Sequence, residues 1–229
     1  MTEMVASPSL HTAPAAPAQQ AVSMLDLDKF NAQPLQRDPF DYLILPGFIK
    51  QGVLAAISRD FPKITQPGSF PSDSLQLSGA FRQFLDELEG EPFRHAVEQK
   101  FGLDLTGRPT IITVRGYTDE TDGRIHTDSR TKIITMLIYF NEAWQESGGR
   151  LRLLRSGTDL EDYVAEVDPA IGTLLAFRRS DNSWHGHKPF VGPRRAIQLN
   201  WVVDEKVKRR EQTRHSISAF FKNLFGGKR

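Results

Sequence analysis

The sequence predicts an α+β fold in which helices come first and a two-sheet β-sandwich or barrel follows. Helix-like apolar spacing dominates the first half, whereas short β-branched and apolar runs recur between turn residues from Pro109 onward, a pattern typical of sandwiches and barrels. The chain has 229 residues, 39% of them hydrophobic and 25% charged, which suits one globular domain with a buried core.

The chain divides into three predicted parts. Residues 1–23 are rich in Ala, Pro, Ser and Gln and are expected to form a disordered tail, because they contain too few large apolar residues to offset the entropy of ordering. Residues 24–203 are expected to form one domain, with helical support over 24–108 and the strand core over 109–203. Residues 204–229 are expected to form a basic amphipathic helix.

The first half of the domain contains one predicted strand and three predicted helices. Phe40–Pro46 reads as an entry strand that ends at its proline. Ile49–Asp60 and Phe81–Phe101 have apolar residues at helical spacing. Gly90 and Pro92 should divide the second stretch into two helices, with the proline near the start of the later one.

The second half is predicted to contain short strands, and two loops could cover a pocket between them. The predicted strands are Thr110–Tyr117, Arg124–Asp128, Thr131–Phe140, Arg150–Leu154, Tyr163–Val167, Gly172–Phe177, Trp184–Phe190 and Ala196–Val203. The loop Gln66–Asp73 and the turn Asp119–Gly123 are rich in turn residues and are candidate lids.

The C-terminal segment differs in charge from the rest of the chain. It carries eight Lys or Arg against three Asp or Glu, and its apolar residues recur at helical spacing: Ile217, Phe220, Phe221, Leu224 and Phe225. Such a helix is expected to dock on the core, on a partner or on an anionic membrane surface.

Composition limits the classes of function. The net charge of +1 gives no reason to expect a nucleic-acid partner. The absence of cysteine excludes disulfides and thiolate metal sites and is consistent with a reducing compartment. No apolar run reaches membrane-spanning length and no secretion signal is recognisable, so a cytoplasmic location is expected.

The candidate chemistry centres on His126 and Asp128. Side chains two residues apart on a strand leave from the same face, so the imidazole and the carboxylate should point into one pocket. A third ligand from His185 or His187 would complete the two-histidine, one-carboxylate set that holds non-haem Fe(II) with open positions. The two later histidines would share a face on a strand, and the residue pattern leaves both open.

An arginine pair follows these histidines. Arg194 and Arg195 come directly after Gly192-Pro193, where a turn would bring the chain back beside the metal ligands. A guanidinium group offers a planar fork suited to a carboxylate. Adjacent strand residues face opposite ways, so only one of the two arginines can enter the pocket.

Residues 110–203 resemble the Fe(II)/2-oxoglutarate-dependent dioxygenases of the prolyl 4-hydroxylase-like type. The matching pieces are Tyr117, His126-Thr-Asp128, Leu137–Asn141, Gly148–Leu153, Gly172–Phe177, His185 with Pro189-Phe190, and Arg195 with Trp201. The resemblance implies a double-stranded β-helix, or jelly roll, with helices packed on one sheet. It also implies the cofactors Fe(II), 2-oxoglutarate and O₂, with ascorbate as a candidate reductant.

The resemblance also assigns roles to individual residues. It implies that His126, Asp128 and His185 bind Fe(II), with His187 at a position where an apolar residue is more usual. Its spacing selects Arg195 for the distal carboxylate of 2-oxoglutarate. By the same resemblance Tyr139 would help hold that carboxylate, and Tyr117 would line the cosubstrate or substrate pocket.

The sequence does not determine the substrate. The resemblance implies hydroxylation of an unactivated C–H bond of a peptidyl or prolyl side chain, with release of succinate and CO₂. Arginines near the predicted pocket could instead favour an anionic small metabolite or sugar derivative; they are Arg115, Arg124, Arg130, Arg150, Arg152, Arg155, Arg178 and Arg179. A non-catalytic jelly-roll binding module is the third possibility. A nucleic-acid demethylase would be expected to carry a second arginine in 196–203, where none occurs.

Overall fold

The computed structural model describes residues 23–211 and 213. Its helices are α1 (Leu27–Ala32), α2 (Gln51–Arg59), the 3₁₀ helix η1 (Ser72–Ser74), α3 (Gly79–Leu88) and α4 (Glu91–Phe101), and residues 205–211 are also helical. Its strands are β1 (Tyr42–Leu45), β2 (Phe70–Pro71), β3 (Thr110–Thr118), β4 (Lys132–Tyr139), β5 (Leu151–Leu154), β6 (Tyr163–Val167), β7 (Leu174–Arg178), β8 (His185–Gly186) and β9 (Gly192–Val202). The expected helical support therefore also contributes two strands to the sheets.

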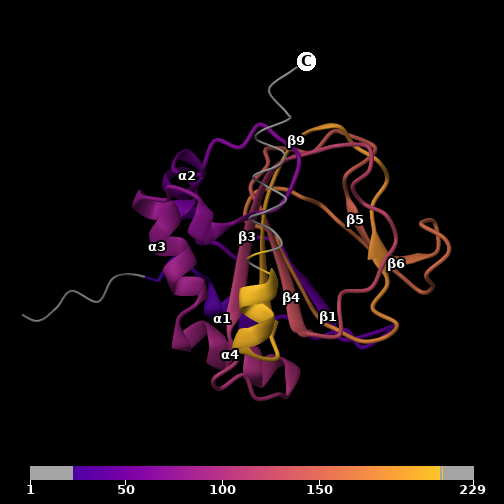
Figure 1. Ribbon diagram of the computed structural model, residues 1–229, viewed down its shortest axis with the longest axis horizontal. Helices are drawn as coiled ribbons and strands as arrows, with labels where there is room; N and C mark the ends of the chain where they lie inside the picture. The colour runs from indigo at the N-terminus through magenta and orange to yellow at the C-terminus, as the bar shows by residue number, and fades with distance from the viewer. Residues whose placement is uncertain (1–22, 212, 214–229) are drawn as a thin grey trace, which may run out of the picture.

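Two antiparallel sheets face each other. The larger sheet has the order β1-β7-β4-β9-β3-β2, and the smaller one has the order β6-β5-β8. Figure 1 shows α1 to α4 on one side of the larger sheet, with β5 and β6 on its other side. This arrangement confirms the predicted sandwich with helices packed on one sheet.

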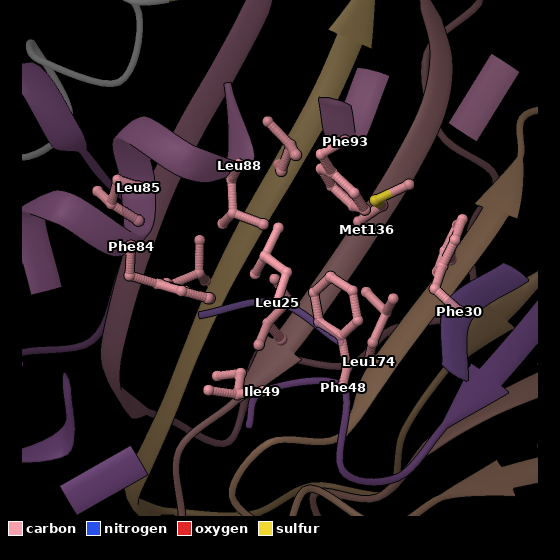
Figure 2. Packing of buried hydrophobic residues seen from close by; sticks show 14 of the residues in the cluster. Leu25, Phe30, Phe48, Ile49, Phe84, Leu85, Leu88, Phe93, Met136 and Leu174 are labelled. Atoms are coloured by element: carbon pink, nitrogen blue, oxygen red, sulfur yellow. The ribbon is translucent and has the colours of Figure 1, made fainter. Parts of the chain in front are cut away.

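The helix-facing side of the larger sheet forms the main hydrophobic core. Successive side chains of a strand point to opposite faces, and alternate residues such as Met136 of β4 and Leu174 of β7 turn toward the helices. Figure 2 shows these two side chains beside the aromatic rings of Phe48 and Phe93. Burying a side chain of this size contributes about 1.5–3 kcal/mol, so this layer fixes the sheet on its helices.

The opposite side of the larger sheet is covered only in part. Tyr139, Leu175 and Phe177 pack there against Leu153 and Val167 of the smaller sheet. Within the described residues, β9 adds only its alanine at position 196 to this second core, and β3 adds none. The inner faces of β3 and of most of β9 are therefore available to line a site.

In the helical half, β1, α3 and α4 agree with the sequence-based boundaries, whereas α1, β2 and η1 were not predicted. β1 ends just before Pro46, and the long apolar stretch is divided into α3 and α4. Gly90 is the N-cap of α4, and Pro92 lies in its first turn. α4 ends at Gly102, whose φ of 62° is a left-handed conformation that glycine adopts without steric cost.

Two predicted strands are much shorter than expected. Within 124–128, His126 forms only an isolated bridge to His185, and the predicted strand 184–190 is reduced to the two residues of β8. The flanking amides bond outside a ladder: Trp184 N donates to Asn182 O, and His187 N donates to Gly123 O at 2.9 Å. Because one turn contact and one irregular contact between the two segments satisfy these amides, the regular ladder does not extend.

Most of the predicted tail and of the predicted C-terminal helix lies outside the described residues. The expected tail 1–23 lies outside the described residues apart from Ser23, and so does the expected apolar face from Ile217 to Phe225. In the described part of the C-terminal helix, Val207 packs against Ile111 and Val202. Within residues 23–211 and 213, no helix is long and apolar enough to cross a membrane.

Candidate metal centre and cosubstrate pocket

Three side chains predicted as metal ligands meet between the sheets. One ligand atom from each of His126, Asp128 and His185 lies within 4.8 Å of the other two. The two histidine backbones exchange N–H···O bonds of 3.0 Å in both directions, which fixes their separation. The spacing and the donor types suit a two-histidine, one-carboxylate Fe(II) site.

Backbone contacts orient both imidazole rings. Nδ1 of His126 lies 2.8 Å from the carbonyl oxygen of Arg124, and Nδ1 of His185 lies 2.9 Å from that of Ser183. When Nδ1 carries the proton and donates to these carbonyls, each Nε2 keeps a free lone pair for a metal.

The charge states of the buried ligands also suit a metal. Burial alone would raise the pKa of Asp128, but the positive charge of Lys132 and hydrogen bonds from Lys132 and Thr135 hold it below its ordinary value. Burial lowers the pKa of His185 to about 4, and the nearby His126 adds to this effect while Asp128 opposes it. A carboxylate and a neutral imidazole are the forms that ligate metals.

His187 lies close by but outside the ligand group. Its Nδ1 is 2.8 Å from the carbonyl oxygen of Lys188. A Cβ at Gly123, whose φ is 89°, would fall 2.4 Å from the His187 ring, so only glycine allows the turn to pack here. Burial, followed by the charge of Arg194, lowers the pKa of His187 to about 4. The structure thus brings His185, rather than His187, to the other two predicted ligands.

Of the two arginines, Arg194 is the buried one, whereas Arg195, which the resemblance selects, lies on the opposite face of β9. Arg195 is exposed and lies over the ring of Phe61 on the helix side, 5.6 Å from its centroid. Arg194 is 3% exposed, donates from Nε to the Gly149 carbonyl at 2.7 Å, and lies 5.2 Å from the centroid of Tyr139. Alternation along β9 is the reason, because Arg195 shares a face with Ile197 of the helix-side core.

Arg194 and Tyr139 each have a buried polar atom that forms no regular hydrogen bond with any described residue. These atoms are Nη2 of the arginine and the hydroxyl of the tyrosine. Burial raises the pKa of Tyr139 and lowers that of Arg194, and the contact of the two groups with each other opposes both shifts. Both groups therefore lack most of the solvation that they have in water. An anionic acceptor between them would restore it, and the distal carboxylate of a 2-oxo acid has the required chemistry.

Tyr117 shows weaker evidence for a role. It is half-buried at the end of β3, after a bulge between Arg115 and Tyr117, where it lies opposite Pro193. Its side chain makes no hydrogen bond with any described residue. Its predicted place in the pocket stays a prediction.

A cavity of about 560 Å³ opens beside the three ligands. It is lined by His126, Asp128 and inward-facing side chains of β3 and β9, among them Thr113, Arg115, Gln198 and Asn200. No Phe, Tyr or Trp occurs among the described residues that line it. The cavity therefore offers mainly hydrogen-bonding groups.

Of the eight arginines expected near the pocket, only Arg115 lines this cavity. Its Nε donates to Ser69 Oγ at 2.7 Å, and its Nη1 contacts Asp122 Oδ1 at 3.2 Å. Arg115 thus ties together the two loops predicted as lids. Arg152 instead pairs with Glu161 and Glu166 on the smaller sheet, which removes it from the set of candidate anion-binding residues.

Four polar residues around the ligands were missed by the sequence reasoning. They are Lys132, Thr135, Gln198 and Asn200, which contact Asp128 or line the cavity beside it. The signal that could have found the last three is their alternation with the apolar helix-facing residues of β4 and β9.

Comparisons with known proteins agree with this geometry. Residues 112–203 match the 2OG-Fe(II) oxygenase superfamily. The matched stretch holds all three predicted metal ligands. Together with the group of His126, Asp128 and His185, the match supports a dioxygenase of the class that uses Fe(II), 2-oxoglutarate and O₂. No curated protein matches the chain.

Solved structures support the fold of this oxygenase. A prolyl-4-hydroxylase from Pseudomonas putida is 19% identical, with 77% of this chain and 90% of that chain covered and a TM-score of 0.50. A prolyl 4-hydroxylase from Phytophthora capsici is 16% identical, with 83% of this chain and 70% of that chain covered and a TM-score of 0.52. The predicted double-stranded β-helix with helices on one sheet is confirmed.

Proposed function

We propose that this oxygenase hydroxylates an unactivated C–H bond of a peptidyl substrate, with a prolyl side chain as the first candidate, and releases succinate and CO₂. The observation that carries the catalytic part is the pairing of two features: the group of His126, Asp128 and His185, and the unpartnered buried atoms of Arg194 and Tyr139. The prolyl assignment rests on the prolyl-4-hydroxylase-like fold.

In this proposal the chain supplies the metal ligands and orients the cosubstrate. His126, Asp128 and His185 would hold Fe(II), while Arg194 and Tyr139 would bind the distal carboxylate of 2-oxoglutarate. When bound, these groups and O₂ supply the oxidation: one oxygen atom enters the C–H bond, and the other enters succinate as CO₂ leaves.

A polar small molecule is the second candidate substrate. Proline-rich peptides in the polyproline II conformation usually dock in aromatic-lined grooves, whereas the cavity beside the ligands lacks Phe, Tyr and Trp among its described lining residues. Its volume of about 560 Å³ lies within the range for small-molecule sites. The polar lining favours a hydroxyl-rich or anionic metabolite, such as a sugar derivative.

An anaerobic titration of 2-oxoglutarate into the Fe(II)-loaded protein tests the cosubstrate site. We expect wild type to bind, His126→Ala to lose metal-dependent binding, and Arg194→Ala to bind at least ~10-fold more weakly, because a hydrogen bond to a charged group contributes about 1.5–3 kcal/mol. Arg195→Ala is the matched control and should bind like wild type. No binding by wild type would overturn the proposal, and loss in Arg195→Ala but not Arg194→Ala would reverse the arginine assignment.

Product analysis then separates the two substrate candidates. Mass spectrometry would follow the gain of one oxygen atom in pools of prolyl peptides, acidic peptides, sugars and sugar phosphates, with succinate measured alongside. Oxygen gain in a prolyl peptide supports the first candidate, and gain confined to a small polar metabolite supports the second.

A further inference from the structure

Both carboxylate oxygens of Asp128 are already held by neighbouring side chains. Lys132 donates from Nζ to Oδ1 at 2.6 Å, and Thr135 donates from Oγ1 to Oδ2 at 2.5 Å. Asp128 is 6% exposed and Thr135 is 1% exposed, so water does not compete for these contacts. With an ammonium group on one oxygen, Asp128 is a carboxylate and can only accept hydrogen bonds.

The single proton of the Thr135 hydroxyl determines which of its two hydrogen bonds it donates. Its Oγ1 is also 3.0 Å from the side-chain amide of Asn200, but a hydroxyl has a single proton. That proton goes to the carboxylate, so Asn200 must direct its NH₂ group, rather than its oxygen, at the hydroxyl. Exchange of the amide oxygen and nitrogen by a 180° rotation satisfies this requirement. The strand register supports the pairing, because Thr135 lies directly opposite Asn200 across β4 and β9.

The chain of polar side chains extends from Asn200 to the cavity. The side-chain nitrogen of Gln198 lies 3.4 Å from the Asn200 amide atom that contacts Thr135. Rotation of Asn200 therefore requires the same 180° rotation of Gln198, whose oxygen then accepts the second N–H of Asn200. Gln198 and Asn200 both line the cavity of about 560 Å³. A continuous polar path therefore leads from the cavity wall to Asp128.

We propose that Thr135 is a positioning residue for Asp128, and that Asn200 holds Thr135 in the orientation that this requires. The inference rests on the proposed function, in which Asp128 binds Fe(II). A carboxylate free to rotate must be ordered when a metal binds, whereas one already held has lost that freedom. Hydrogen-bond partners of metal ligands typically change metal affinity by about 10–100-fold.

The test is the Fe(II) affinity of the full chain, measured by equilibrium dialysis without O₂ and without 2-oxoglutarate. Thr135→Val removes the hydroxyl with little change of shape and should weaken Fe(II) binding by at least ~10-fold. Thr135→Ser keeps the hydroxyl and should stay within about threefold of wild type. Thr118→Val makes the same change in another buried strand threonine, whose hydroxyl faces the Gly192 carbonyl, and should bind like wild type.

A double variant tests the second link. Asn200→Leu should weaken Fe(II) binding less than Thr135→Val does, and Thr135→Val/Asn200→Leu should bind no more weakly than Thr135→Val alone, because both changes act through one contact. Additive losses would overturn the role of Asn200. Circular dichroism would confirm that each variant is folded, and Thr135→Ala carries the same expectation if the valine variant does not fold.

The outcomes separate this inference from the proposed function. Wild-type protein that binds no Fe(II) would overturn the metal site itself. Wild-type binding together with full Fe(II) affinity in folded Thr135→Val or Thr135→Ala would overturn only the positioning role. Weak binding in the valine variant that the serine variant restores would support it.

Discussion

Arg194 and Tyr139 show how single residues can prepare a binding site at a cost in stability. Each has a buried polar atom without a regular hydrogen bond to any described residue, and such an atom costs about 1–3 kcal/mol when it is left unpaired. In the proposed function, the cosubstrate carboxylate is the acceptor that both groups would share.

Replacement of Tyr139 by Phe should therefore change stability and binding in opposite directions. The variant loses an unpartnered buried hydroxyl, so its free energy of unfolding without ligand should equal that of wild type or exceed it by up to about 1 kcal/mol. Its 2-oxoglutarate affinity should fall about 5–10-fold, the value of one hydrogen bond. Urea unfolding and anaerobic calorimetry measure the two quantities, and a stability loss above about 1 kcal/mol would contradict this account.

At the scale of elements, strand alternation and helix ends decide where charges lie. Because side chains alternate along β9, Arg195 faces the helices and Arg194 faces the opposite side of the sheet. At the start of α3, Ser78 provides no side-chain cap. Asp60, which follows α2, instead accepts a hydrogen bond from the Ala80 amide at 2.8 Å, and a negative charge is favourable at a helix N-terminus.

The Asp60 contact predicts a dependence of stability on pH. The hydrogen bond from the Ala80 amide, followed by that from Arg59, lowers the pKa of Asp60. A lowered carboxyl pKa stabilises the fold above the unfolded-state value of about 3.9, and this stabilisation is lost as pH falls through the folded-state pKa. We expect Asp60→Asn to lower the melting temperature at pH 7, with a difference that shrinks below about pH 4.

Thermal melts of wild type and Asp60→Asn between pH 3 and pH 7 would measure this effect. Glu142→Gln, which removes an exposed carboxylate after β4, serves as the control. A difference between wild type and Asp60→Asn that stays constant down to pH 3 would show that the charge of Asp60 is not its cause.

In the molecule as a whole, the larger sheet separates the hydrophobic core beneath the helices from the layer that holds the predicted metal ligands. One face is sealed by the helices, as Figures 1 and 2 show. Among the described residues, the other is covered by the smaller sheet over β1, β4, β7 and Ala196 of β9, which leaves the metal ligands beside an open cavity. The buried charge of Asp128 is balanced there by Lys132. The folded state and the metal-bound state therefore both need a positive charge beside Asp128.

This shared requirement predicts that a metal ion can replace the lysine charge. Lys132→Met should lower the free energy of unfolding of the metal-free protein by about 2 kcal/mol, between the values for exposed and fully buried ion pairs. Added Mn(II) should raise the melting temperature more in this variant than in wild type, because the ion supplies the missing positive charge and stabilises the folded state by mass action. Lys132→Arg keeps the charge and is the control. An equal rise in both proteins would contradict the link.

The sequence by itself predicted the order of the longer helices and strands and the break at Gly90, which follow from local periodicity and turn residues, but not the short elements α1, η1 and β2. It also predicted that His126 and Asp128 lie together, although the strand on which that argument rested is reduced to a bridge at His126. The short bridge between His126 and His185 was predicted as two longer strands, because sequence does not reveal which backbone groups are satisfied by turns.

Only the tertiary structure decided which arginine and which histidine enter the site. Arg194 and Arg195 are equivalent in sequence, and the choice depends on which face of β9 packs against the helices. Likewise His185 and His187 were expected to share a face, but His185 is the one that forms a bridge with His126. The contacts of Lys132, Thr135 and Asn200 with one another or with Asp128 also depend on strand pairing. Such choices rest on register between distant segments, and register is a property of the assembled sheets.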